Sequence, residues 1–178
     1  KAQVIVKHEQ PFELLESLLV ENGSFYLLEE HLDRLSQSAN YFGWAIHLET
    51  VRAVLEEHAA LLANGSYKVR LLVSRLGEVT VESTEISELG EEIQVSIAKK
   101  PVASANVFLF HKTTNRAVYN EHQPEAGCFD VLLYNERGEV TEFVNGNVVF
   151  ELEGKWYTPP VECGLLAGTY RASLLDSG

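Results

Sequence analysis

Methionine is absent from the sequence, so residue 1 is not expected to be a natural start. Cysteine is nearly absent too: Cys128 and Cys163 form no CxxC pattern, which excludes a disulfide framework. No apolar run approaches the ~20 residues that a membrane-spanning helix needs, and residues 1–10 lack the apolar segment of a signal peptide. These absences predict a protein of the reducing cytoplasm.

Basic residues are scarce. The chain carries 14 Lys and Arg against 26 Asp and Glu, a formal net charge of -12. This balance argues against a nucleic-acid-binding protein, because phosphate contacts need clustered lysine and arginine. An anionic substrate would have to be held by a local group of cations against an unfavourable overall field. What remains is a globular composition, with 46% apolar residues among 178, enough for one good core or two small ones.

The first 104 residues alternate between strand spacing and helix spacing, which is typical of an α+β unit with antiparallel strands. Asn22-Gly23 is a strong short hairpin signal, and Gly43 stops a run of apolar residues at helical spacing. The expected elements are a hairpin over 11–28, helices over 29–43 and 47–65, a hairpin over 67–84 that turns at Gly77, and a strand over 91–100.

The pattern restarts after a connector at residues 100–107, and we therefore predict two domains, 1–104 and 105–178. The elements expected in the second are a strand over 107–112 that ends at Lys112, a helix over 113–122, a hairpin over 128–142 around Gly138, a hairpin over 147–158 that turns at Gly154, and a glycine-bracketed loop that opens a helix over 158–175. Because the chain ends just after the first turns of that helix, the C-terminal domain is expected to be incomplete.

Four features of the sequence suit a phosphorylated aldehyde cofactor: Arg34 on a helix, Lys112 and Glu142 at strand ends, and the glycine-rich loop CGLLAGTYR running into a helix. Each alone is more often a solvated charge or a helix cap. Together they match distinct tasks. A helix N-terminus and an arginine bind phosphate, and a lysine forms Schiff bases with carbonyls. A carboxylate opposite a pyridine nitrogen keeps that nitrogen protonated. The combination indicates a site for pyridoxal phosphate (PLP).

The order of these features resembles the class IV, or fold-type IV, PLP enzymes, which include branched-chain and D-amino-acid aminotransferases and 4-amino-4-deoxychorismate lyase. The resemblance covers essentially the whole chain, and the fold class that it implies is α+β with two domains. It rests on "FELLESLL" and "LLEEHLDRLSQSANYFG", on "HKTTNRAVY", and above all on "GEVTEFVNGNVVFELEGKWYTPPVECGLLAGTYR". The K-x-x-N-R form of the lysine segment favours the lyase. The short lead-in resembles a lyase segment fused behind a chorismate-using aminodeoxychorismate synthase component.

The resemblance implies roles for five residues of this chain. Lys112 would hold the cofactor covalently and shuttle a proton. Glu142 would pair with the pyridine nitrogen, and Arg34 would bind the cofactor phosphate. The backbone N–H groups of Thr169 and Tyr170 would complete the phosphate cup.

Other candidate residues are interpreted as structural. Asn147 and Arg171 match motif positions but are assigned supporting roles. Residues 168–171 read Gly-Thr-Tyr-Arg where the aminotransferases have G-I-T-R, which puts one threonine contact to phosphate in doubt and again favours a lyase. Cations that could face a substrate carboxylate, although a surface position is favoured for all of them, are Arg70, Arg75, Lys99 and Lys100. No metal is expected, because a second ligand at metal spacing is missing beside the helix histidines His31, His47 and His58.

The resemblance implies a homodimeric lyase that converts 4-amino-4-deoxychorismate to 4-aminobenzoate and pyruvate in folate biosynthesis. Two alternatives stay open. One is an aminotransferase of the same fold that acts on branched-chain or D-amino acids, whose chemistry would begin identically, so that Lys112 and Glu142 do not distinguish it. The other is a non-catalytic dimerisation module fused to a chorismate-using enzyme, which simple addition of PLP would separate from either enzyme.

Overall fold

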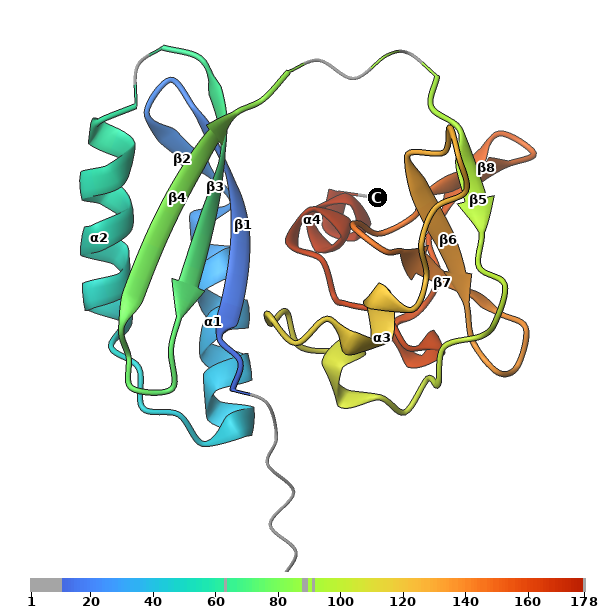
Figure 1. Ribbon diagram of the computed structural model, residues 1–178. Helices are drawn as coiled ribbons and strands as arrows, with labels where there is room; N and C mark the ends of the chain where they lie inside the picture. The colour runs from blue at the N-terminus through green and yellow to red at the C-terminus, as the bar shows by residue number, and fades with distance from the viewer. Residues whose placement is uncertain (1–10, 63, 88–89, 91, 178) are drawn as a thin grey trace, which may run out of the picture.

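The first half of the chain is a four-stranded antiparallel sheet with two helices on one face (Figure 1). The computed structural model describes residues 11–62, 64–87, 90 and 92–177. The strand order is β2-β1-β3-β4. The elements are β1 (Leu14–Glu21), β2 (Ser24–Tyr26), α1 (Leu28–Phe42), α2 (Leu48–Ala60), β3 (Ser66–Val73) and β4 (Val79–Glu85). These bounds confirm the two predicted hairpins and the two predicted helices of this half.

Local signals explain where these elements turn and end. Asn22 and Gly23 both have positive φ, 50° and 77°, as a tight hairpin between β1 and β2 requires. Helix α1 ends at Gly43, which has φ 68° and donates its amide to the Asn40 carbonyl at 3.2 Å. Between the helices and the sheet lies one continuous apolar core, to which β1 contributes Leu14, Leu18 and Val20.

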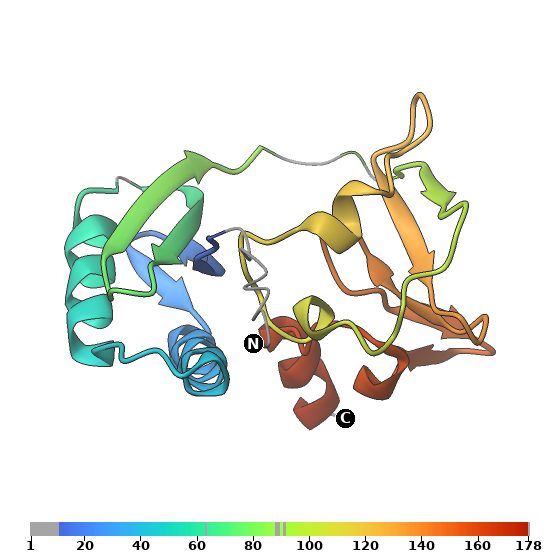
Figure 2. The ribbon, with the colours of Figure 1, turned by 60° about the horizontal axis from the view of Figure 1, so that its bottom comes forward.

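The second half contains a smaller sheet, a separate hairpin and two helices. Its elements are β5 (Val95–Ile97), α3 (Ala117–Asn120), β6 (Asp130–Tyr134), β7 (Val140–Phe143), β8 (Phe150–Leu152), β9 (Lys155–Tyr157) and α4 (Thr169–Ser177), with 3-10 turns at Val107–Leu109 and Val161–Cys163. Strand β6 lies between β5, which is parallel to it, and β7, which is antiparallel. Helix α4 lies between the two halves, close to α1 (Figures 1 and 2).

Strand β5 bears on the predicted division of the chain. It was placed in the first domain, yet it pairs with β6 in the second sheet. The change from one sheet to the other therefore falls between β4 and β5, ahead of residue 104. The division at 104/105 itself stays a prediction.

The segment before the lysine differs from the prediction. A strand was expected over 107–112, but Val107–Leu109 forms a 3-10 turn, which the Asn106 side chain caps by accepting the Phe108 amide at 3.0 Å. The expected helix over 113–122 is reduced to the four residues of α3. Four successive apolar residues carry no alternation, so periodicity could not separate a strand from a turn of helix here.

Three general features can be stated for the described part of the chain. No helix in it is both long enough and apolar enough to cross a bilayer. It contains no group of three His, Cys, Asp or Glu side chains placed to hold a metal ion. Cys128 and Cys163 are both free thiols.

Candidate active site

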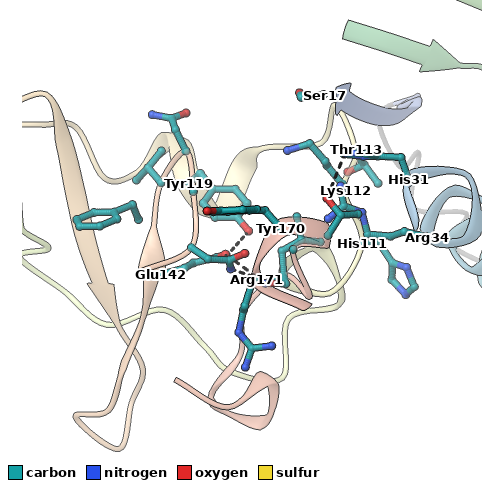
Figure 3. Close-up of a pocket in the computed structure, with 18 of the residues that line it drawn as sticks. Ser17, His31, Arg34, His111, Lys112, Thr113, Tyr119, Glu142, Tyr170 and Arg171 are labelled. Atoms are coloured by element: carbon teal, nitrogen blue, oxygen red, sulfur yellow. Dashed lines mark hydrogen bonds between the residues drawn. The ribbon is translucent and has the colours of Figure 1, made fainter. Parts of the chain in front are cut away.

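A cavity of about 520 Å³ lies where the two halves meet, and residues of both halves line it (Figure 3). Its volume is in the range of small-molecule and cofactor sites. All five residues assigned from the sequence border it, as do both motif residues given supporting roles: Arg34, Lys112, Glu142, Thr169, Tyr170, Asn147 and Arg171. In Figure 3, Arg34 and His31 lie on one side of Lys112, and Glu142 and Tyr119 lie on the other.

The first half of the fold holds the backbone of Lys112. The Lys112 carbonyl accepts the Leu15 amide at 3.0 Å, and the Thr114 amide donates to the Glu13 carbonyl at 2.9 Å. Thr113 forms an antiparallel bridge with Leu14 at the start of β1. A strand of the second domain was expected to end at Lys112. Instead, the lysine lies on a short extension of the first sheet.

The amine of Lys112 is easier to deprotonate than an ordinary lysine. Its pKa is lowered to about 8, first by burial at the cavity wall and then by the nearby positive charge of Arg34, against an opposing effect of Glu16. Among the described residues, no side chain forms a hydrogen bond or an ion pair with this amine. A lysine in this state is a nucleophile and a proton acceptor near neutral pH.

This lowered pKa predicts a distinctive labelling profile. In cofactor-free protein, acylation of Lys112 by a small reagent is expected to reach half its maximal rate near pH 8. An ordinary lysine has a pKa of about 10.4, so Lys112 has roughly two orders of magnitude more neutral amine at pH 7. Competitive labelling read by peptide mass spectrometry, with the exposed Lys155 as internal control, measures both profiles. A midpoint for Lys112 above pH 10 would contradict the buried position.

Glu142 on β7 is a buried carboxylate surrounded by hydrogen-bond donors. Its Oε1 accepts the Tyr119 hydroxyl at 2.8 Å, and its Oε2 accepts the Asn147 amide and the Leu166 backbone N–H, each at 3.2 Å. Burial is the largest influence, and the pKa of Glu142 is raised to about 7 although the hydrogen bonds from Tyr119 and Leu166 and the charges of Lys112 and Arg116 oppose the shift. At neutral pH the group can thus hold a proton or give it up.

Tyr119, which donates to this carboxylate, and Arg116 also line the cavity. The guanidinium carbon of Arg116 lies 4.5 Å from the centroid of the Tyr119 ring, a cation–π distance. Arg116 also donates to the Val144 carbonyl at 2.6 Å. Burial, followed by the charge of Glu142, raises the pKa of Tyr119, so its hydroxyl remains a donor to Glu142.

The first turn of α4 borders the opposite end of the cavity. The amides of Thr169 and Tyr170 are in this turn, where N–H groups have no carbonyl partner within the helix. A side chain at Gly168 would collide with the carboxamide of Asn147, which donates to the Leu166 carbonyl at 2.9 Å. A glycine is therefore needed where the loop enters the helix.

Arg34 reaches the cavity from α1 with part of its guanidinium already engaged. Nε and Nη2 donate to Glu16 at 2.9 and 2.5 Å, and Nη1 donates to the Ala167 carbonyl at 3.1 Å. Because a guanidinium has five N–H groups, two remain for an anion. The assignment of Arg34 to the cofactor phosphate stays a prediction.

The two motif residues with supporting roles occupy structural positions. Asn147 joins Glu142 to the loop before α4. Arg171 donates to the Thr158 hydroxyl at 3.2 Å and to the Pro159 carbonyl at 2.8 Å, which ties α4 to the preceding loop. Tyr170 takes the place of a threonine in the motif, and its side chain is exposed at the rim, 6.3 Å from the ring of Tyr26.

The four cations considered for a substrate carboxylate do not line this cavity. Arg70 lies 3.9 Å from Glu82 on the sheet surface. Lys99 and Lys100 border a second, smaller cavity and pair with acidic residues there.

Sequence reasoning missed the residues that support the site. They are Glu16, His31, Arg116 and Tyr119.

Comparison with known proteins identifies the family of this chain. Residues 13–178 match the family described as Amino-transferase class IV. A Schizosaccharomyces pombe protein, assigned provisionally as an aminodeoxychorismate lyase, is 36% identical over 165 residues, 88% of this chain and 71% of that protein. A crystal structure from Mesorhizobium loti, assigned provisionally as an amino-acid aminotransferase, aligns with TM-score 0.83 and 33% identity over 94% of this chain and 84% of that one.

A second structure shows the same fold with ligands. It is a hypothetical aminotransferase from Mycobacterium tuberculosis with α-ketoglutarate and PMP bound, which aligns with TM-score 0.73 and 23% identity over 92% of this chain and 66% of that one. Enzymes of class IV depend on PLP, and their fold is the fold type IV expected from the motifs. This chain belongs to the class IV aminotransferase family of PLP-dependent enzymes.

Proposed function

We propose that this chain is a PLP-dependent lyase that converts 4-amino-4-deoxychorismate to 4-aminobenzoate and pyruvate in folate biosynthesis. The observation that carries the choice is the 36% identity to the Schizosaccharomyces pombe protein assigned to that reaction. The K-x-x-N-R form of the segment Lys112–Arg116 supports the same choice. By the family's usual organisation we further propose a cytoplasmic homodimer, and a fusion to a synthase domain stays a prediction.

The residues that line the cavity fit PLP. Lys112 offers a partly neutral amine, which a covalent bond to an aldehyde requires. Glu142 offers a carboxyl group of intermediate pKa for a ring nitrogen. Arg34 and the first-turn amides of α4 offer N–H donors for a phosphate. When bound, PLP supplies a protonated ring that spreads negative charge away from the reacting carbon.

Lys112 has two tasks in this proposal. Its amine would hold PLP covalently, and as a free amine it would be placed to take the proton from the substrate ring carbon that carries the amino group. A base works best when its pKa is near the working pH, and the buried position gives Lys112 that property. Glu142 keeps a proton on the cofactor ring nitrogen, and Tyr119 and Asn147 fix the direction of its oxygens.

The substrate carries two carboxylates, and the net charge of -12 disfavours any dianion. Cations at the cavity wall offset that field locally. Besides Arg34 and Lys112, the wall includes Arg116. A dicarboxylate can approach this wall although the protein as a whole is acidic.

The test is a direct assay of both reaction types. Protein supplied with PLP is incubated with 4-amino-4-deoxychorismate, and 4-aminobenzoate and pyruvate are measured together. Parallel reactions contain a branched-chain or D-amino acid with 2-oxoglutarate. Equal amounts of both products, with no transamination above background, are expected. Transamination without 4-aminobenzoate would overturn the lyase in favour of an aminotransferase, which the 33% identity to the Mesorhizobium loti protein supports.

A further inference from the structure

Glu16 is a buried acid to which the proposed chemistry gives no role. It lies on β1 with only 2% of its surface exposed, on the face of the sheet that carries Leu14 and Leu18. An ionised carboxylate in such a position is costly unless it is fully hydrogen-bonded. Glu16 meets this condition: it accepts Nε of Arg34 at 2.9 Å, Nη2 of Arg34 at 2.5 Å and Nδ1 of His31 at 2.7 Å.

These partners keep Glu16 negatively charged. Burial is the largest single influence and works against ionisation, but the hydrogen bond from His31 and the charge and hydrogen bonds of Arg34 outweigh it, and the pKa of Glu16 lies below its ordinary value. A carboxylate can only accept hydrogen bonds, so Nδ1 of His31 carries a hydrogen. The other ring nitrogen of His31 then faces the Thr169 hydroxyl at 3.2 Å.

Both partners of Glu16 also form hydrogen bonds with one short segment of the other half. Arg34 donates from Nη1 to the Ala167 carbonyl at 3.1 Å. His31 reaches Thr169, the first residue of α4, two positions further on. Glu16 thus holds two side chains of α1, and each of them contacts the segment 167–169 across the junction between the halves.

We propose that Glu16 is a positioning residue for cofactor phosphate. Through Arg34 it fixes the direction of the free guanidinium N–H groups, and through His31 it fixes the first turn of α4, so that both sets of donors converge before the cofactor arrives. The inference rests on the proposed function, in which Arg34 and the amides of Thr169 and Tyr170 bind that phosphate. It extends the function to Glu16, which does not itself line the cavity.

The test compares two ligands that differ only in the phosphate. Dissociation constants for PLP and for pyridoxal are measured by absorbance titration on the wild type and on Glu16→Gln. Gln keeps the shape of the side chain but removes the charge and one acceptor. Because a hydrogen bond to a charged group is involved, affinity for PLP is expected to fall by about 10- to 100-fold. Affinity for pyridoxal is expected to change by less than about threefold, since pyridoxal lacks the phosphate.

The matched control is Glu29→Gln on α1, the helix that carries His31 and Arg34. Glu29 also accepts two hydrogen bonds from one arginine, Arg52, at 2.8 and 2.7 Å, but the pair is exposed to solvent. Its removal should leave both dissociation constants unchanged. His31→Gln is a second test variant that keeps the Arg34–Glu16 pair. It should reduce the affinity for PLP by a smaller factor, about three- to tenfold, and leave the affinity for pyridoxal unchanged.

The outcomes separate the inference from the function on which it rests. If the wild type binds PLP no better than pyridoxal, the phosphate assignment itself fails. If the wild type prefers PLP and Glu16→Gln keeps the whole preference, Glu16 has no positioning role. The same conclusion follows if the variant loses affinity for PLP and pyridoxal by equal factors. Should Glu16→Gln not fold, His31→Gln decides in the same way: a reduced preference for PLP supports the proposal, and an unchanged preference overturns it.

Discussion

Replacing Lys112 with methionine is expected to abolish turnover and at the same time to stabilise the cofactor-free protein. Turnover is lost because no other described side chain places an amine in the cavity. Stability rises because the buried ammonium is costly: its pKa of about 8 lies below the ordinary value. At pH 7 the difference corresponds to a destabilisation on the order of 2–3 kcal/mol, which methionine does not suffer.

The gain in stability from Lys112→Met is expected to depend on pH. The folded-state pKa of Lys112 is lowered, so its penalty is complete below about pH 8 and disappears as the pH rises toward the unfolded value of about 10.4. Denaturant unfolding of both proteins at pH 7 and at pH 10 measures the change. Lys155→Met, at an exposed position of β9, is the control and should show no such convergence. A variant no more stable than the wild type at pH 7 would show that the amine is solvated.

Replacing Glu142 with glutamine is expected to lower kcat by about 10²- to 10³-fold while PLP remains covalently attached. The glutamine cannot hold a positive ring nitrogen as a carboxylate does, so the charge that develops during proton removal is no longer spread into the ring. Attachment persists because Lys112 and Arg34 are unchanged. The measurement combines kcat, determined at saturating substrate, with the amount of cofactor trapped on the protein by borohydride.

Two further variants test whether this loss is specific. Glu139→Gln, three residues earlier, removes an exposed partner of Arg137 and should leave kcat unchanged. Tyr119→Phe removes one donor to Glu142, and we expect kcat to fall by about 10- to 100-fold, because a hydrogen bond to a charged group contributes about 1.5–3 kcal/mol. A Glu142→Gln variant within threefold of the wild type would remove this carboxylate from the proposed mechanism.

The features predicted correctly from the sequence depend on local signals. The turns at Asn22-Gly23 and Gly138 follow from residues that adopt positive φ, which the sequence shows directly. The same applies to helix α1, whose apolar spacing and terminal glycine lie within one segment. The positions of Lys112 and Glu142 in the cavity came from an ordered set of motifs, whose family and cofactor the comparisons confirm. Their individual roles stay predictions.

The supporting residues could not be predicted, because each acts through a partner far away in the chain. Tyr119 donates a hydrogen bond to Glu142, which is 23 positions further along the chain. His31 is hydrogen-bonded to Thr169, which is 138 positions further along. No periodicity reports such contacts. One signal was present in β1, where Glu16 interrupts a face that is otherwise apolar. A charged residue on the buried face of a strand indicates a paired group, and this one could have been singled out before the structure was known.

The hydrogen bonds between residues 13–15, at the start of β1, and residues 112–114 have a consequence for biosynthesis. They join residues about 100 positions apart, Glu13 and Thr114 among them. Contacts of such sequence separation form late, because a long loop must close first. While the chain is being made, this lysine is an ordinary protonated side chain that reacts poorly with aldehydes. Reactivity arises only on docking, so capture of cofactor reports that both halves have folded, and it should be the first property lost when they separate.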